Sequence, residues 1–255
     1  MIQKIAFREP SPFELYLPEG CGPFPLICLT PILGRLLFLE DLFMERGFAR
    51  FFASRGFAAA LIERPIFEFN PARGLEQIQR YLEESILRNE KVLDELLLRK
   101  EIDPVKIGSF GISFGAVLNS LWAAADPRLK AHVFALAGGN IPEILITSRD
   151  PLMRSYLKTI TKSVGMDGKE LKEAFEKMIR LDPLKAAASI PRETVFMMLG
   201  IFDRVIRFRY GRLLWQALGK PETLFLPLGH YTSLITIPFT QWKALEFFKK
   251  KLGLQ

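Results

Sequence analysis

The sequence predicts an α/β protein whose mostly parallel central sheet carries helices on both faces. Uninterrupted apolar runs at residues 26–30 and 57–62 are typical of strands that are buried on both faces. Residues 75–99 then show apolar positions at helical spacing, which indicates a long amphipathic helix. Strands that alternate with helices form parallel sheets, because each helix returns the chain across the sheet between two strands.

The same alternation continues along most of the chain. We expect two short strands at residues 5–8 and 13–17, separated by Pro10 and Pro12. Asp103-Pro104 breaks the long helical pattern, and a short strand then leads into a turn around Ser113. Further strands are expected at 131–136, 194–199 and 222–226, and further helices at 40–54, 114–125, 208–218 and 240–252.

The length of 255 residues and the hydrophobic content of 49% are enough for one large core, so we expect a single domain over residues 1–255. Between residues 141 and 190 the alternation stops, and helical patterns at 151–163 and 168–181 replace it. We interpret residues 141–190 as a helical cap inserted over the active edge of the sheet. An ordinary surface insertion is the alternative.

A motif of the form G-x-S-x-G, made by Gly111, Ser113 and Gly115, lies between a predicted strand and a predicted helix. A serine on such a tight turn has a strained backbone, and neighbouring chain approaches it from both sides, so the flanking positions need glycine. The helix that follows points its free N–H groups at the serine, and the Phe114 amide can stabilise an oxygen anion there. We therefore predict Ser113 as a nucleophile.

A serine hydroxyl needs a base before it can attack a carbonyl group, and histidine is the usual base at neutral pH. The chain has two histidines. His132 lies inside an apolar strand, which favours a structural role. His230 follows the last predicted strand, in a loop at the catalytic edge of the sheet, and is our candidate for the base.

The imidazole in turn needs an acceptor that fixes its tautomer. Asp203 follows the predicted strand at 194–199 and lies in a turn at the same edge of the sheet, so it is the candidate acid. Asp150 also follows a strand, but it lies within the expected cap and is the reserve.

Ser113, Asp203 and His230, in this order and each after a predicted strand, resemble the alpha/beta-hydrolase superfamily of serine esterases and peptidases. The resemblance covers about residues 25–252. It implies Ser113 as nucleophile, His230 as general base and then acid, and Asp203 as the partner that orients His230.

Members of this superfamily often carry His-Gly after the strand that feeds the oxyanion hole. Here that place has Thr30-Pro31, and proline has no N–H to donate. We therefore expect the oxyanion hole to use the amides of Ile32 and Phe114, with Leu33 in reserve. The alternative is that Thr30-Pro31 is an ordinary turn in a loop and has no part in an oxyanion hole.

Other function classes lack their motifs. There is no zinc-type Cys/His spacing, no phosphate-binding loop and no dinucleotide fingerprint, so no metal or cofactor is expected. The net charge of +7 is spread along the chain, and its one tight cluster, at residues 249–251, suits a solvated helix end, so no nucleic-acid partner is expected. Two cysteines, no signal segment and no long apolar run lead us to expect a cytoplasmic protein without membrane insertion. The sequence does not predict the oligomeric state.

We expect a carboxylesterase that cleaves small esters with apolar acyl groups through an acyl-enzyme on Ser113. The alternatives are a prolyl-oligopeptidase-like peptidase, an acyltransferase, and a binding protein that keeps the fold without turnover. Bulky apolar residues near the expected site are candidates for an acyl pocket, and each could equally be core: Ile32, Leu33, Phe38, Phe43, Met44, Ile144, Leu145, Ile146, Leu152, Met153, Tyr156, Leu234, Ile235 and Phe239.

Overall fold

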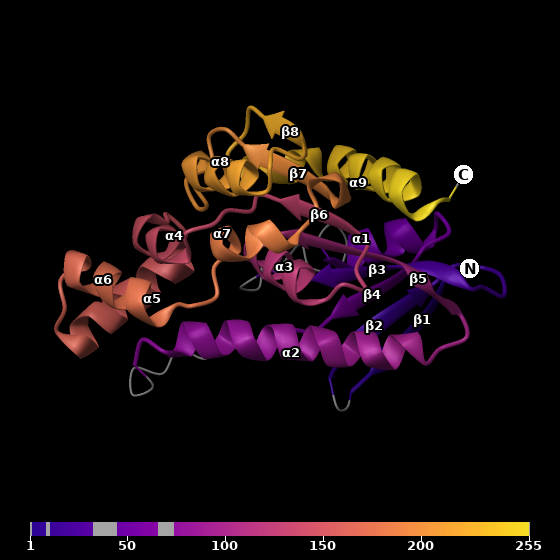
Figure 1. The fold of residues 1–255 in the computed structure, drawn as a ribbon, viewed down its shortest axis with the longest axis horizontal. Helices are drawn as coiled ribbons and strands as arrows, with labels where there is room; N and C mark the ends of the chain where they lie inside the picture. The colour runs from indigo at the N-terminus through magenta and orange to yellow at the C-terminus, as the bar shows by residue number, and fades with distance from the viewer. Residues whose placement is uncertain (1, 9–10, 33–44, 66–73, 255) are drawn as a thin grey trace.

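An eight-stranded sheet runs through the centre of the protein in a computed structural model that describes residues 2–8, 11–32, 45–65 and 74–254 (Figure 1). The strand order is β1-β2-β4-β3-β5-β6-β7-β8. Strand β2 pairs antiparallel with both β1 and β4, and all other neighbouring strands pair parallel. The strands are β1 (Gln3–Phe7), β2 (Phe13–Leu17), β3 (Phe24–Thr30), β4 (Ala58–Ile62), β5 (Ile102–Ile112), β6 (Ala131–Ala135), β7 (Val195–Gly200) and β8 (Glu222–Leu226).

Helices connect the parallel strands. In the part of the chain that the structure describes they are α1 (Glu45–Ala53), α2 (Gln77–Leu97), α3 (Phe114–Ala125), α4 (Ile141–Thr147), α5 (Pro151–Val164), α6 (Gly168–Met178), α7 (Pro183–Ala186), α8 (Phe208–Ala217) and α9 (Ile237–Leu252). The mostly parallel sheet and its flanking helices confirm the predicted fold class.

The central strands are apolar on both sides because both of their faces are covered. In β3, Ile27 and Leu29 pack into the core on the side of α1 and α9, whereas Leu26 and Cys28 pack into the core on the opposite side, against α2 and α3. The same alternation holds in β4. An uninterrupted apolar run is therefore the expected sequence of a strand between two helical layers.

The four helices between β6 and β7 occupy the segment interpreted as a cap. Figure 1 shows α4, α5 and α6 beyond one end of the sheet, next to the end of α2. A side chain caps the start of each of the four. At α5, Asp150 accepts from the Met153 amide, and at α6, Asp167 forms a capping box with Glu170. The structure adds the short α4, which the sequence analysis did not separate.

The strand that leads to Ser113 begins earlier than expected. Asp103-Pro104 was expected to precede the strand that leads to Ser113, but both residues lie within β5. The pairing with β3 shifts register there, from Phe24–Ile102 to Leu26–Ile107, and such an irregular stretch accommodates a proline that cannot donate to the ladder. The expected helix 40–54 appears as α1 from Glu45, and residues 40–44 lie outside the described part of the chain.

His132 lies in the middle of β6 and is almost completely buried. Its Nδ1 lies 2.9 Å from the hydroxyl of Ser109 on β5, the strand that pairs with β6. Burial lowers the pKa of this imidazole from 6.5 to about 3. The neutral ring therefore belongs to the core, as the apolar strand around it led us to expect.

We expect His132 to make the stability of the protein pH-dependent. Below pH 6.5 the His132 imidazole binds a proton in the unfolded chain but stays neutral in the folded chain. The free energy of unfolding therefore falls as the pH decreases, until the pH nears 3. The slope from this one group is at most about 1.4 kcal/mol per pH unit. Urea unfolding of the wild type and of His132→Gln at several pH values isolates the effect, because the other titrating groups are common to both. Equal slopes in the two proteins would contradict it.

Candidate active site

Ser113 lies on the turn between β5 and α3, and its backbone is in the left-handed region with φ 57°. Residues other than glycine rarely adopt this conformation, and it costs of order 1–3 kcal/mol. The turn is held from one side by the hydrogen bond from the Ser113 amide to the Ala135 carbonyl of β6, at 2.8 Å. The strained turn lifts the serine side chain above the end of the sheet.

Gly111 and Gly115 let the chain close around this turn. A Cβ on Gly115 would lie 2.4 Å from the carbonyl oxygen of Thr30, and a Cβ on Gly111 would lie 2.5 Å from the carbonyl oxygen of Gly115. The Thr30 hydroxyl fastens the end of β3 to the turn by donating to the Gly115 carbonyl at 2.8 Å. The two glycines therefore bring the end of β3 next to Ser113.

The loops after β7 and β8 are joined to each other. The amide of Ile201 donates to the Leu226 carbonyl at 2.8 Å, and the amide of Phe202 donates to the Leu228 carbonyl at 3.0 Å. Beyond this joint lie Asp203 on the first loop and His230 on the second. The pairing of the loops extends the sheet by one step and places the two side chains side by side.

Asp203, His230 and Ser113 form one chain of hydrogen bonds. His230 Nδ1 lies 2.6 Å from Asp203 Oδ2, and His230 Nε2 lies 2.8 Å from Ser113 Oγ. The other carboxylate oxygen of Asp203 accepts from the amides of Val205 and Ile206, at 2.7 and 3.0 Å, so the carboxylate cannot rotate away. The geometry brings together the three residues that the sequence selected, with the imidazole between the other two.

The two candidate oxyanion donors have different surroundings. Phe114 is the first residue of α3, so its N–H has no acceptor within the helix. The Ile32 N–H donates to a carboxylate oxygen of Glu45 at 2.6 Å, and the Ile32 carbonyl accepts from Arg64. Ile32 also lines a pocket together with Ser113. The reserve donor, Leu33, lies outside the described residues.

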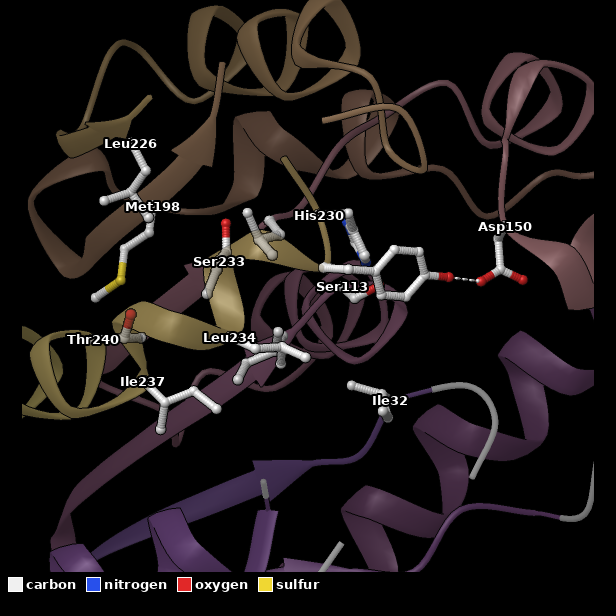
Figure 2. Close-up of a pocket in the computed structure, with 14 residues that line it drawn as sticks. Ile32, Ser113, Asp150, Met198, Leu226, His230, Ser233, Leu234, Ile237 and Thr240 are labelled. Atoms are coloured by element: carbon white, nitrogen blue, oxygen red, sulfur yellow. Dashed lines mark hydrogen bonds between the residues drawn. The ribbon is translucent and has the colours of Figure 1, made fainter. Parts of the chain in front are cut away.

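Two pockets meet at Ser113. The first, here called the sheet pocket, lies over the ends of the strands and has mostly apolar walls, including Ile112, Leu136, Met198, Leu226, Leu234 and Ile237. Figure 2 shows Met198 and Leu226 at one end of this pocket and Asp150 at the other, with Ser113 and His230 between them. The second, here called the helix pocket, lies against α3, α4 and α5 and is lined by Val117, Ile141, Ile144, Leu145, Met153 and Ile206.

The acyl-pocket candidates divide between these pockets and other places. Ile32 and Leu234 line the sheet pocket, and Ile144, Leu145 and Met153 line the helix pocket. Tyr156 and Ile146 belong to the core around α2 and α4–α6, and three others are exposed to solvent: Leu152, Ile235 and Phe239. Leu33, Phe38, Phe43 and Met44 lie outside the described residues.

Asp150 does not act as the partner of His230 in this structure. Its Oδ2 accepts from the hydroxyl of Tyr231 at 2.6 Å, and both residues line the sheet pocket. The sequence analysis did not single out Tyr231, although its position directly after His230 could have drawn attention to it. Among the described residues, no group of three or more His, Cys, Asp or Glu side chains is placed to hold a metal ion. No described helix is both long and apolar enough to cross a bilayer.

No family model matches the sequence. The curated relatives include Esterase FrsA of Escherichia fergusonii, 30% identical over 155 residues, and Esterase FrsA of Escherichia coli O157:H7, 29% identical over 155 residues. Each alignment covers 60% of this chain and 34% of the relative. The chain thus spans about a third of the length of these relatives.

Solved structures resemble the protein over nearly its whole length. Acetyl xylan esterase from Paenibacillus sp. R4 superposes with a TM-score of 0.71 at 17% identity, covering 98% of this chain and 88% of the esterase. The chain has the alpha/beta-hydrolase fold. An acylaminoacyl peptidase of Pyrococcus horikoshii gives a TM-score of 0.70 at 18% identity, with 98% of this chain and 41% of the peptidase covered. At these identities the likeness concerns the fold of the protein.

The alpha/beta-hydrolase fold explains why the three candidate residues could be found in order along the chain. In an open parallel sheet, ligands bind beyond the carboxyl ends of the strands. Ser113 follows β5, Asp203 follows β7 and His230 follows β8, so all three reach the same edge. His132 lies within β6, and its ring bonds to Ser109 on β5. Among the described residues it makes no hydrogen bond to Ser113, Asp203 or His230.

Gly115→Ala should impair the site more than the fold. The added Cβ would collide with the backbone oxygens of Thr30 and Pro31, at 2.4 and 2.7 Å, so the end of β3 has to move away from Ser113. We expect any hydrolysis of a p-nitrophenyl ester at Ser113 to fall by about 100-fold, the size of the effect of losing one oxyanion donor. Initial rates with a p-nitrophenyl ester measure it. Gly168→Ala is the control, because nothing lies within 4 Å of the new Cβ there. Wild-type rates in Gly115→Ala would refute the close packing.

Proposed function

We propose that the protein is a serine carboxylesterase that cleaves esters with apolar acyl groups through an acyl-enzyme on Ser113. The observation that carries the proposal is the unbroken hydrogen-bond chain from Asp203 through His230 to the Ser113 hydroxyl, with links of 2.6 and 2.8 Å. The likeness to FrsA esterases over 155 residues supports the same reaction class.

The proposed reaction begins when His230 Nε2 takes the hydroxyl proton of Ser113 as its Oγ bonds to the ester carbonyl carbon. The tetrahedral intermediate expels the alcohol, whose oxygen receives the proton from His230, and the acyl group remains on Ser113. Water then attacks the acyl-enzyme as His230 takes its proton. The bond from Ser113 Oγ to the acyl carbon breaks, His230 returns the proton to Oγ, and the carboxylic acid leaves. Asp203 keeps the Nδ1 proton in place and stabilises the charged imidazole in both steps.

The walls of the sheet pocket support an apolar acyl group. Met198, Leu226 and Ile237 line it on the side away from Asp150, and burial of a hydrocarbon chain against such residues contributes about 0.8 kcal/mol per methylene. We further propose that residues 141–190 act as a cap within a single domain over residues 1–255, because α4 and α5 supply walls of the helix pocket beside Ser113.

The amides of Phe114 and Ile32 are proposed to hold the oxyanion. The Phe114 amide is available at the start of α3. The Ile32 amide is engaged by Glu45, so the substrate oxygen has to replace that carboxylate before the second hydrogen bond can form. A hydrogen bond to a charged group contributes about 1.5–3 kcal/mol, and the new bond to the substrate oxygen offsets only part of that loss.

Labelling by a fluorophosphonate should modify Ser113 far faster than any other residue, because a serine activated by an adjacent base is a much stronger nucleophile than an ordinary hydroxyl. Ser113→Ala should lose the adduct and reduce hydrolysis of p-nitrophenyl butyrate by roughly 10,000-fold or more. Mass spectrometry locates the adduct, and the melting temperature should stay within a few degrees of the wild type.

His230→Gln and His132→Gln form a matched pair for the same assay. The first should abolish hydrolysis, whereas the second should retain it, because His132 is buried away from the site. The reverse pattern would refute the assignment of the base. A folded wild type that neither takes the label nor hydrolyses esters would favour the binding-protein alternative, and faster turnover of N-acyl p-nitroanilides than of esters would favour a peptidase.

Glu45→Ala should accelerate hydrolysis. Without the carboxylate, the Ile32 amide is free for the substrate oxygen, and we expect kcat for p-nitrophenyl butyrate to rise by about threefold to tenfold. Glu45→Gln keeps a weaker, neutral acceptor and should show a smaller rise. A lower kcat in both variants would mean that Glu45 holds the Ile32 peptide in its productive orientation.

A further inference from the structure

Asp150 is placed at the boundary between the two pockets and is a wall of both. Three hydrogen bonds fix it: its amide donates to the Ser148 hydroxyl at 3.2 Å, its Oδ1 accepts from the Met153 amide at 2.9 Å, and its Oδ2 accepts from Tyr231 at 2.6 Å. The dashed line in Figure 2 marks the last of these bonds. The carboxylate is therefore held in one position beside the site of the nucleophile.

The charge of this carboxylate is not neutralised by a basic side chain among the residues that the structure describes. Glu14 binds Lys4 and Arg46, and Asp126 binds Arg128. The buried Asp182 accepts from backbone amides, but it lines neither pocket. No lysine or arginine is among the described residues that line either pocket. In a chain with a net charge of +7, the described residues that line the two pockets thus include one carboxylate, that of Asp150, and no lysine or arginine to balance it.

A carboxylate in apolar surroundings favours a cationic ligand. It has about four acceptor positions, and the Met153 amide and the Tyr231 hydroxyl occupy two of them, so capacity remains for an ammonium group. The apolar walls raise the strength of that attraction and repel an anionic substrate at the same time. Tyr231 as a residue is 44% exposed, and its ring offers a further surface for a cation.

We infer that Asp150 is a specificity-determining residue that recognises a positively charged amino group on the substrate. The inference rests on the proposed hydrolase function and narrows its substrate class. Asp150 and the apolar end formed by Met198 and Leu226 lie on opposite sides of Ser113 in the sheet pocket. The substrate is accordingly an ester with an apolar part on one side of the scissile bond and an ammonium group on the other.

The experiment compares matched esters that differ in charge alone. One pair places the charge on the acyl group: p-nitrophenyl 6-aminohexanoate against p-nitrophenyl heptanoate. The other places it on the alcohol: butyrylcholine against 3,3-dimethylbutyl butyrate. In the wild type, kcat/KM should favour the cationic member of at least one pair by about tenfold. The p-nitrophenyl half-ester of adipic acid, which carries a carboxylate in place of the ammonium group, should have the lowest kcat/KM of the three p-nitrophenyl esters.

Asp150→Asn removes the charge but keeps an oxygen that can cap α5, and its amide nitrogen can donate to the Tyr231 hydroxyl in place of the bond that the carboxylate accepts. The ratio of cationic to neutral kcat/KM should fall to within about threefold of one. Asp167→Asn is the control, because Asp167 caps α6 in the same way at an exposed position outside both pockets, and its ratio should equal that of the wild type. If Asp150→Asn lowered kcat/KM equally for the cationic and the neutral ester of each pair, Asp150 would have a purely structural role and the inference would be overturned.

A binding measurement separates this inference from the proposed chemistry. Isothermal titration calorimetry of the wild type should show tighter binding of hexylammonium than of hexanol, by about tenfold, and Asp150→Asn should abolish the difference. This result would stand even if no ester were hydrolysed and Ser113 took no label, in which case the hydrolase proposal alone would fail. Equal binding of the two ligands by the wild type would overturn the recognition of a cation.

Discussion

The close approach of the end of β3 to the β5–α3 turn is the constraint on which the rest of the site depends. Backbone atoms of Thr30 and Gly115 come so near that no side chain fits between them, and the Thr30 hydroxyl closes the contact with a hydrogen bond. The same contact holds Ser113 in its left-handed conformation and brings Ile32 to the edge of the pocket. One packing contact therefore sets the position of Ser113 and one wall of its pocket together.

Much of the fold was predictable because its signals are local. Strands buried on both faces are apolar without interruption, and helix starts such as those at Asp150 and Asp167 carry their own capping residues. The positions of Ser113, Asp203 and His230 followed from the same pattern, because a parallel sheet collects the residues after its strands at one edge. The position of each residue directly after a predicted strand was therefore enough to predict that the three lie close together.

The parts that could not be predicted depend on contacts between distant segments. Nothing near Ile32 in the sequence indicates that its amide meets Glu45 on α1 or that its carbonyl meets Arg64 after β4. Asp150 appeared as a reserve catalytic acid, yet 81 positions separate it from Tyr231, and only the folded chain shows that the two are bonded. Pro104 was read as a break, because a sequence does not reveal that the facing strand shifts its register there.

The loop that carries His230 has to cover a long distance. It leaves β8, whereas Ser113 leaves β5, and two strands lie between them in the sheet. Three strand spacings of about 4.8 Å amount to roughly 14 Å, so the loop and the turn at Ser113 lean toward each other over the ends of β6 and β7. Residues of those covered ends, Leu136 and Met198, form the floor of the sheet pocket, and Leu234 comes from the segment above them. The cavity thus lies beneath a loop whose reach is set by the strand order. A deletion within residues 227–236 would both reduce the volume of the sheet pocket and draw His230 away from Ser113.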